Sequence, residues 1–130
     1  MIQSPKKVEI KISPGKGRGV FATQFIEIGE TIEICPVLEL PTIPDIDDFL
    51  LSDYRFMFGS KDNYKYVLPL GYGCIYNHDD NNNAKWRDRY DINSIEFYSI
   101  RPIKPGEEIC TRYTENPDDY FKFRTHIKKV

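Results

Sequence analysis

The sequence contains little sulfur. Its 130 residues include only three cysteines, Cys35, Cys74 and Cys110, which are far apart and lie among apolar or strand-forming neighbours. An odd number of widely spaced cysteines gives neither a disulfide framework nor a CxxC zinc site. We therefore expect three reduced thiols, most of them buried.

The chain also lacks a long apolar run and a basic excess. No stretch approaches the ~18 apolar residues of a membrane span, and no charged leader followed by an apolar segment opens the chain. We therefore expect an intracellular protein with no membrane partner. The formal net charge of −2 disfavours direct binding of nucleic acid, because such domains usually carry a basic excess that neutralises phosphates. A basic protein partner suits this charge better.

The length allows one compact domain and is too short for two ordinary ones. A hydrophobic fraction of 40%, with eight Phe and nine Tyr, supplies enough apolar area to offset the conformational entropy of folding. We therefore expect residues 1–130 to form a single folded domain that carries the whole function.

Short alternating segments predict strands along most of the chain. Residues 8–12 alternate apolar and charged side chains with a period of two, which places one face on a core. Further extended segments, separated by glycine and proline turns, cover residues 20–22, 25–34, 66–75, 94–100 and 109–113. Cys35-Pro36 is expected to end the second of these.

Two short helices are expected beside these strands. In residues 44–59 the apolar side chains recur near helical spacing, and Asp45 can cap the first turn. Asn116, followed by a proline and two acids, has the composition of a second helix start before an aromatic segment at 120–123. Many short strands, few helical windows and no strand-helix alternation predict a mostly β domain of small sheets.

A glycine segment lies between the first two predicted strands. Gly17-Arg18-Gly19 allows the backbone to adopt positive φ and to approach a ligand closely, because the glycines carry no Cβ. Taken alone, a GxG between strands is more often only a tight turn. The segment becomes informative through the motifs that accompany it.

A polar segment follows a short apolar strand in the middle of the chain. Asn77-His78 and the five acidic and amide residues after it have side chains that bond their own backbone, so an asparagine-rich loop is one interpretation. A metal site on His78, Asp79 and Asp80 is another, disfavoured because adjacent residues rarely face one ion and no second histidine is near. Tyr113 ends the last predicted strand, where a tyrosine usually packs its ring and exposes its hydroxyl.

Three motifs, taken in order, resemble those of one family. They are Lys16-Gly17-Arg18-Gly19-Val20-Phe21-Ala22, then Tyr76-Asn77-His78 with Asn83, then Gly106-Glu107-Glu108-Ile109 with Tyr113. The set resembles the SET domain of protein lysine methyltransferases over about residues 8–121, and is most similar to the short stand-alone SET proteins of viruses and bacteria. The resemblance implies several small β-sheets with short helices, in which the Asn-His segment and the tyrosine strand thread past each other like a knot.

The resemblance also implies roles for individual residues. Tyr113 matches the catalytic tyrosine, and Tyr54 is implied as a second tyrosine of the catalytic pocket. The residues implied to bind the cofactor S-adenosyl-L-methionine are Lys16, Gly17, Arg18, Gly19, Tyr72, Asn77, His78 and Phe121. Among these, Asn77 would hold the amino-acid end of the cofactor, and Phe121 or its neighbour Tyr120 would stack on the adenine. No metal is implied.

The sequence departs from the family pattern in three ways. Asn82 replaces a proline that often precedes the second asparagine of the motif. Thr111 stands two residues before Tyr113, where many relatives carry the Phe or Tyr that limits how many methyl groups are added. The cysteine-rich, zinc-binding flanks of many relatives are missing. The resemblance therefore implies a core at about residues 8–115 and an aromatic tail, residues 116–130, that closes the cofactor site unaided.

The implied function is transfer of a methyl group to a lysine amine of a basic protein, such as a histone or a histone-like protein. A SET-like module that binds cofactor or peptide without turnover is an alternative, although it would be expected to lose Tyr113 or the Asn77-His78 pair. A nucleic-acid adaptor that uses Arg87 and Arg89 is another, although acidic residues interleave with both. A minimal core could also pair as a homodimer, and a viral or effector protein would act in a host nucleus instead of the cytoplasm.

Overall fold

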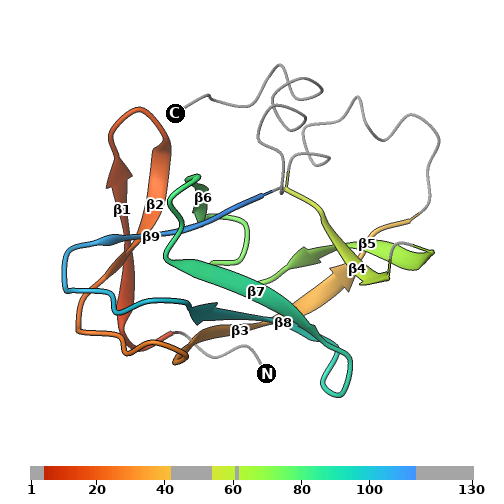
Figure 1. The fold of residues 1–130 in the computed structure, drawn as a ribbon. Coiled ribbons are helices and arrows are strands. Elements are labelled where there is room, and N and C mark those ends of the chain that lie inside the picture. The colour runs from red at the N-terminus through yellow and green to blue at the C-terminus, as the bar shows by residue number, and fades with distance from the viewer. Residues whose placement is uncertain (1–4, 42–53, 61, 114–130) are drawn as a thin grey trace.

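The computed structural model describes residues 5–41, 54–60 and 62–113, which form nine strands (Figure 1). The strands are β1 (Val8–Ser13), β2 (Gly17–Ala22), β3 (Thr31–Glu39), β4 (Phe56–Ser60), β5 (Asn63–Pro69), β6 (Asn77–His78), β7 (Ala84–Arg89), β8 (Ser94–Ser99) and β9 (Glu108–Thr111). This confirms the mostly β class. No helix that could cross a membrane is found among the described residues.

The first sheet has the order β1-β2-β9-β6. Strand β9, near the end of the described chain, lies between β2, to which it is antiparallel, and the two-residue strand β6, to which it is parallel (Figure 1). Asn77 pairs with Cys110, and His78 pairs with Thr111. This sheet therefore brings together the three motifs found in the sequence.

The second sheet has the order β4-β5-β3-β8-β7. Its long strand β3 pairs with β8 as far as Pro36 and with β5 from Val37 onward. The expectation that Cys35-Pro36 ends this strand is wrong, since β3 continues to Glu39. Pro36 lies where β3 changes partners, so its missing N–H costs little pairing at that position.

A single core joins the two sheets. Its buried side chains come from β1, β2 and β9 on one side and from β3, β4, β5, β7 and β8 on the other. The Tyr76 ring stacks on Phe97 with centroids 4.4 Å apart. Burial of each such large side chain contributes about 1.5–3 kcal/mol, so Tyr76 anchors the chain just before β6.

Two other expected elements differ from the structure. Residues 56–59, expected at the end of a helix, belong to strand β4, in which Phe58 is buried while Met57 is exposed, the alternation of a strand. The extended segment expected at 66–75 ends with β5 at Pro69, because Gly71 adopts a φ of +81° and a turn follows. The rest of the first helix and the whole helix after Asn116 lie outside the described residues.

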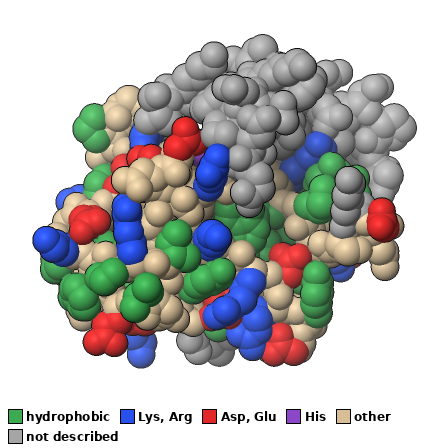
Figure 2. Space-filling model, viewed as in Figure 1, with side chains coloured by type: hydrophobic (Ala, Val, Ile, Leu, Met, Phe, Trp, Pro, Cys, Tyr) green, Lys and Arg blue, Asp and Glu red, His purple; other side chains and the backbone are tan. Residues whose placement is uncertain are grey.

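Strand β7 was not expected from the sequence. Ala84 is buried and Trp86 is half-buried, while Lys85 and Arg87, which alternate with them, are exposed. Arg87 and Arg89 both pair with Glu96 of β8, and Arg89 also pairs with Asp91. These ion pairs occupy the two arginines considered for phosphate binding, and Figure 2 shows basic and acidic side chains interspersed over the visible face.

Candidate active site

Glu108 of β9 links strands β1 and β6 and, through Asn77, strand β2. Asn77 of β6 donates its side-chain amide N–H groups to the Arg18 carbonyl of β2, at 3.0 Å, and to Glu108 Oε2 of β9, at 2.7 Å. Ser13 Oγ of β1 donates to Glu108 Oε1 at 2.7 Å. Both carboxylate oxygens thus accept charge-assisted hydrogen bonds. Within the described part of the chain, no donor reaches Asn77 Oδ1, which remains an acceptor for a ligand.

The glycine segment is needed for a close approach at this junction. Gly19 has an ordinary φ, but a Cβ on it would overlap Glu108 Oε2 and lie 3.0 Å from Asn77 Nδ2. Gly17 has a φ of +80°, which favours glycine. The interpretation of the segment as only a tight turn is therefore incomplete, because β2 begins at Gly17 and its backbone contacts the Asn-His segment.

His78 is buried and holds Tyr113 in place. Its Nδ1 accepts a hydrogen bond from the Tyr113 backbone N–H at 2.9 Å, and its Nε2 lies 2.9 Å from Asp80 Oδ1. Since Nδ1 is an acceptor, the ring proton is assigned to Nε2, which donates to Asp80. Both ring nitrogens are therefore engaged within the protein, which leaves no nitrogen lone pair for a metal.

Tyr113 lies two residues beyond the end of β9, which the sequence had placed at Tyr113 itself. Its hydroxyl donates to the Tyr76 carbonyl oxygen at 2.5 Å, and its ring lies 5.2 Å from the His78 ring at an angle of 60°. The backbone, ring and hydroxyl are each fixed by a residue next to Asn77. The hydroxyl proton points to Tyr76, which fixes the direction in which the oxygen presents its lone pairs.

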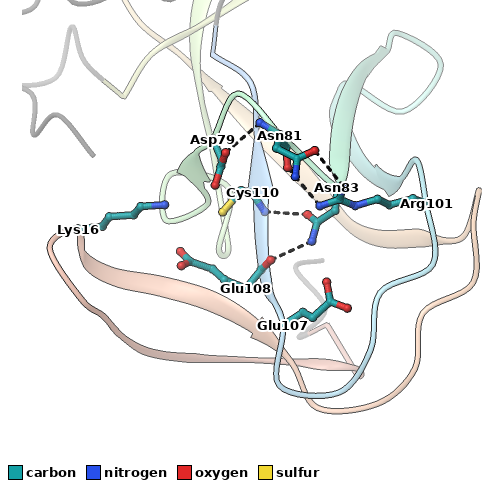
Figure 3. Close-up of a pocket in the computed structure, with 8 residues that line it drawn as sticks. All are labelled: Lys16, Asp79, Asn81, Asn83, Arg101, Glu107, Glu108 and Cys110. Atoms are coloured by element: carbon teal, nitrogen blue, oxygen red, sulfur yellow. Dashed lines mark hydrogen bonds between the residues drawn. The ribbon is translucent and has the colours of Figure 1, made fainter.

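A polar cavity of about 210 Å³ adjoins the Glu108 junction (Figure 3). It is lined by Lys16, Asp79, Asn81, Asn83, Arg101, Glu107, Glu108 and Cys110. Asn83 receives the Cys110 N–H and donates to the Glu108 carbonyl, both at 2.9 Å, as the dashed lines in Figure 3 show. Burial raises the pKa of the Cys110 thiol to about 12, so the thiol is neutral. Charged groups of both signs line this cavity, which suits a ligand that carries both charges.

The other predicted site residues lie in different places. The Tyr72 backbone N–H donates to Glu33, and the Tyr54 carbonyl lies 3.7 Å from Cys74 Sγ, so both tyrosines adjoin the turn that leads to Tyr76. No hydrogen bond joins either hydroxyl to a described residue. Phe121 lies outside the described residues, and its role stays a prediction.

Two carboxylates of the site were missed as individual residues. Glu108 was visible only as part of an acidic motif near Tyr113. Glu33 was hidden because it alternates in the sequence with Ile32 and Ile34, a pattern that favours both isoleucines facing inward. A register shift between Thr31 and Glu33 changes that alternation, so that Glu33 is 4% exposed and Ile34 is 40% exposed.

The chain is similar to proteins of one family in sequence and in structure. The SET domain family profile matches residues 17–114. A Schizosaccharomyces pombe protein, the histone-lysine N-methyltransferase that is H3 lysine-37 specific, is 34% identical over 120 residues, which cover 89% of this chain and 78% of that protein. The crystal structure of a provisionally assigned histone methyltransferase from Plasmodium falciparum superposes with a TM-score of 0.68 at 34% identity, over 88% of this chain and 97% of that one. The chain belongs to the SET-domain family.

Proposed function

We propose that this chain is a protein-lysine methyltransferase that transfers a methyl group from S-adenosyl-L-methionine to the side-chain amine of a lysine. The observation that carries the proposal is the placement of Tyr113: His78 holds its backbone, and the Tyr76 carbonyl holds its hydroxyl. A module that only bound cofactor would not need an oriented hydroxyl beside the Asn-His segment. Family membership and the relative of known activity support the same conclusion.

The residues at the Glu108 junction fit the methionine end of the cofactor. Asn77 Oδ1 and the Glu108 carboxylate are acceptors for an ammonium group, and Lys16 provides a positive charge for a carboxylate. Gly19 keeps the backbone of β2 close to these groups, because a side chain there would displace them. When bound, S-adenosyl-L-methionine supplies an electrophilic methyl group on a positively charged sulfur.

Tyr113 provides the oriented acceptor that this chemistry needs. Methyl transfer to an amine is an in-line displacement, so alignment of the reacting atoms supplies most of the catalysis. The lone pairs of the Tyr113 oxygen can accept weak CH···O bonds from a polarised methyl group and orient the lysine amine. Desolvation and a nearby positive charge both lower the pKa of the substrate lysine, so that its proton can pass to water without a dedicated base.

The substrate we propose is a lysine in a basic protein, a histone or a histone-like protein. This rests on the two relatives, both described as histone methyltransferases, and on the formal net charge of −2, which suits a basic partner. We further propose action inside a cell, in the cytoplasm or, for a viral or effector protein, in a host nucleus. We also propose that the chain forms a homodimer and binds neither nucleic acid nor a membrane directly.

The test is methylation of a defined panel. The full chain is incubated with methyl-labelled cofactor and each of the purified core histones, a bacterial histone-like protein and an acidic control protein, and the labelled residue is mapped by mass spectrometry. We expect label on lysine of at least one basic protein and none on the acidic control. Absence of label on every basic protein, with cofactor bound, would show a binding module instead of an enzyme.

A further inference from the structure

Glu33 is a buried carboxylate in the middle of β3 that binds both ends of one turn. It is 4% exposed. Its Oε2 accepts the Tyr72 backbone N–H at 2.9 Å, and its Oε1 accepts the Tyr76 hydroxyl at 2.6 Å. A Cβ on Gly71 would overlap Oε2, so the turn passes directly against the carboxylate. A single side chain therefore holds both ends of the turn.

The anchored turn leads straight into the candidate active site. Tyr76, 2% exposed, is held at its ring by Phe97 and at its hydroxyl by Glu33, while its carbonyl accepts the Tyr113 hydroxyl. Two hydrogen bonds, joined by the covalent frame of Tyr76, thus connect the Glu33 carboxylate to the hydroxyl of Tyr113. A shift of the Tyr76 backbone would turn that hydroxyl away from its present direction.

Stability alone does not account for a carboxylate at this position. Burial raises the pKa of Glu33, which means that the surroundings disfavour its charge, although the Tyr72 and Tyr76 donors oppose that effect. An apolar side chain would fill the same inward position of β3 without that cost. What Glu33 adds is direction, since its two oxygens fix the donors of Tyr72 and Tyr76, four residues apart, in one arrangement.

We propose that Glu33 is a positioning residue for methyl transfer, which acts through Tyr76 to set the direction of the Tyr113 hydroxyl. The inference rests on the proposed function, because it assumes that Tyr113 contacts the reacting groups. Glu33 itself contacts neither Tyr113 nor the Glu108 junction. It should therefore affect the rate of the chemical step and leave the binding of cofactor largely intact.

Matched substitutions separate positioning from general stability. Glu33→Leu removes both acceptors, and Tyr76→Phe removes only the hydroxyl that joins Glu33 to the turn. Glu33→Gln is the conservative variant, because its oxygen can accept the Tyr72 N–H while its NH₂ group donates to the Tyr76 hydroxyl. Glu96→Leu is the control: Glu96 is 3% exposed on the neighbouring strand β8, but its carboxylate contacts no residue of the candidate site.

The readouts are the single-turnover methylation rate and the calorimetric Kd for S-adenosyl-L-homocysteine. We expect Glu33→Leu and Tyr76→Phe to lower the rate about ten- to a hundredfold, with Kd within about threefold of the parent and the rate partly restored in Glu33→Gln. Glu96→Leu should lower the melting temperature and keep the parental rate. A parental rate in Tyr76→Phe, or an equal loss of rate in Glu96→Leu, would overturn the proposal.

A second readout does not depend on turnover. In protein labelled with ¹³C at the tyrosine Cζ, the Tyr113 signal is assigned by its loss in Tyr113→Phe. We expect this signal to move in Glu33→Leu and in Tyr76→Phe and to stay in place in Glu96→Leu. An unmoved Tyr113 signal would refute the positioning role of Glu33, even if the protein methylates histones. A moved signal in a protein without methyltransferase activity would refute only the proposed function. If Glu33→Leu does not fold, Tyr76→Phe and Glu33→Gln carry both tests.

Discussion

Gly19→Ala tests whether the Glu108 junction binds the cofactor. The backbone φ of Gly19 is ordinary, so alanine is not strained there, and the whole effect of the substitution comes from space. The new methyl group would overlap Glu108 Oε2 and press on Asn77 Nδ2. Although the end of a glutamate side chain can move, this one is held by Ser13 on one oxygen and by Asn77 on the other.

The size of the effect follows from the bonds that must break. Displacing Glu108 Oε2 removes its 2.7 Å bond from Asn77, and a hydrogen bond to a charged group contributes about 1.5–3 kcal/mol. We expect the free energy of unfolding to fall by that amount. If the same groups bind the methionine end of the cofactor, the Kd for S-adenosyl-L-homocysteine should rise about ten- to a hundredfold, since each ~1.4 kcal/mol is a factor of ten.

The assay is calorimetric titration with S-adenosyl-L-homocysteine, together with denaturant unfolding. Gly15→Ala is the matched control: Gly15 has a φ of +77°, and no atom lies within 4 Å of its Cβ position. Its substitution should cost about 1–2 kcal/mol of stability through backbone strain and leave Kd unchanged. Parental affinity in Gly19→Ala, with a measurable loss of stability, would refute the assignment of this junction to the cofactor.

Three further predictions concern affinity and pH. Asn77→Ala should weaken the rise in melting temperature that saturating cofactor produces, because it removes the acceptor Oδ1 and the hydrogen bond to Glu108 Oε2. Full retention of that rise would contradict the assignment of Asn77 to the cofactor site. Phe121→Ala should raise the cofactor Kd about two- to tenfold through loss of a stacking ring, measured by the same titration, and an unchanged Kd would place Phe121 outside the site. Hydrogen bonds from Arg87 lower the pKa of Glu96 from 4.5 to about 2, so the contribution of Glu96 to stability is complete above about pH 4.5 and is lost as the pH falls through 2. Denaturant unfolding of Glu96→Gln should therefore show a weaker dependence on pH in that window. An unaltered dependence would contradict the pairing.

Local alternation was enough to predict several strands. Residues 8–12 and 94–100 correspond closely to β1 and β8, because each carries apolar side chains at a period of two with a turn on either side. Strand β7 could not be predicted in this way, since only Ala84 and Trp86 are apolar. Its two arginines both pair with Glu96 of β8, and that pairing is not visible before the strands are aligned.

The candidate active site, like the fold, could be predicted only in part from the sequence. The family motifs named Asn77, His78 and Tyr113, but the sequence does not show that β6 runs parallel to β9, which is what places His78 Nδ1 against the Tyr113 N–H. Glu33 could not be identified for a different reason: a register shift between Thr31 and Glu33 interrupts the alternation, so that Glu33 is buried next to the buried Ile32. Closure by residues 116–130 stays a prediction because those residues lie outside the described part. Knot-like threading stays a prediction as well, since the pairing of β6 with β9 does not by itself establish that the two segments thread past each other.

The central claim is that Tyr113 is the catalytic residue of a lysine methyltransferase. Tyr113→Phe keeps the ring and its contact with His78 and removes only the oxygen that is held by Tyr76. Loss of a preorganised polar group of this kind costs about 2.7–4 kcal/mol of transition-state stabilisation, so single-turnover methylation of a histone substrate should slow about a hundred- to a thousandfold while the Kd for S-adenosyl-L-homocysteine stays at the parental value. A mutant that transfers methyl groups at the parental rate would contradict the claim.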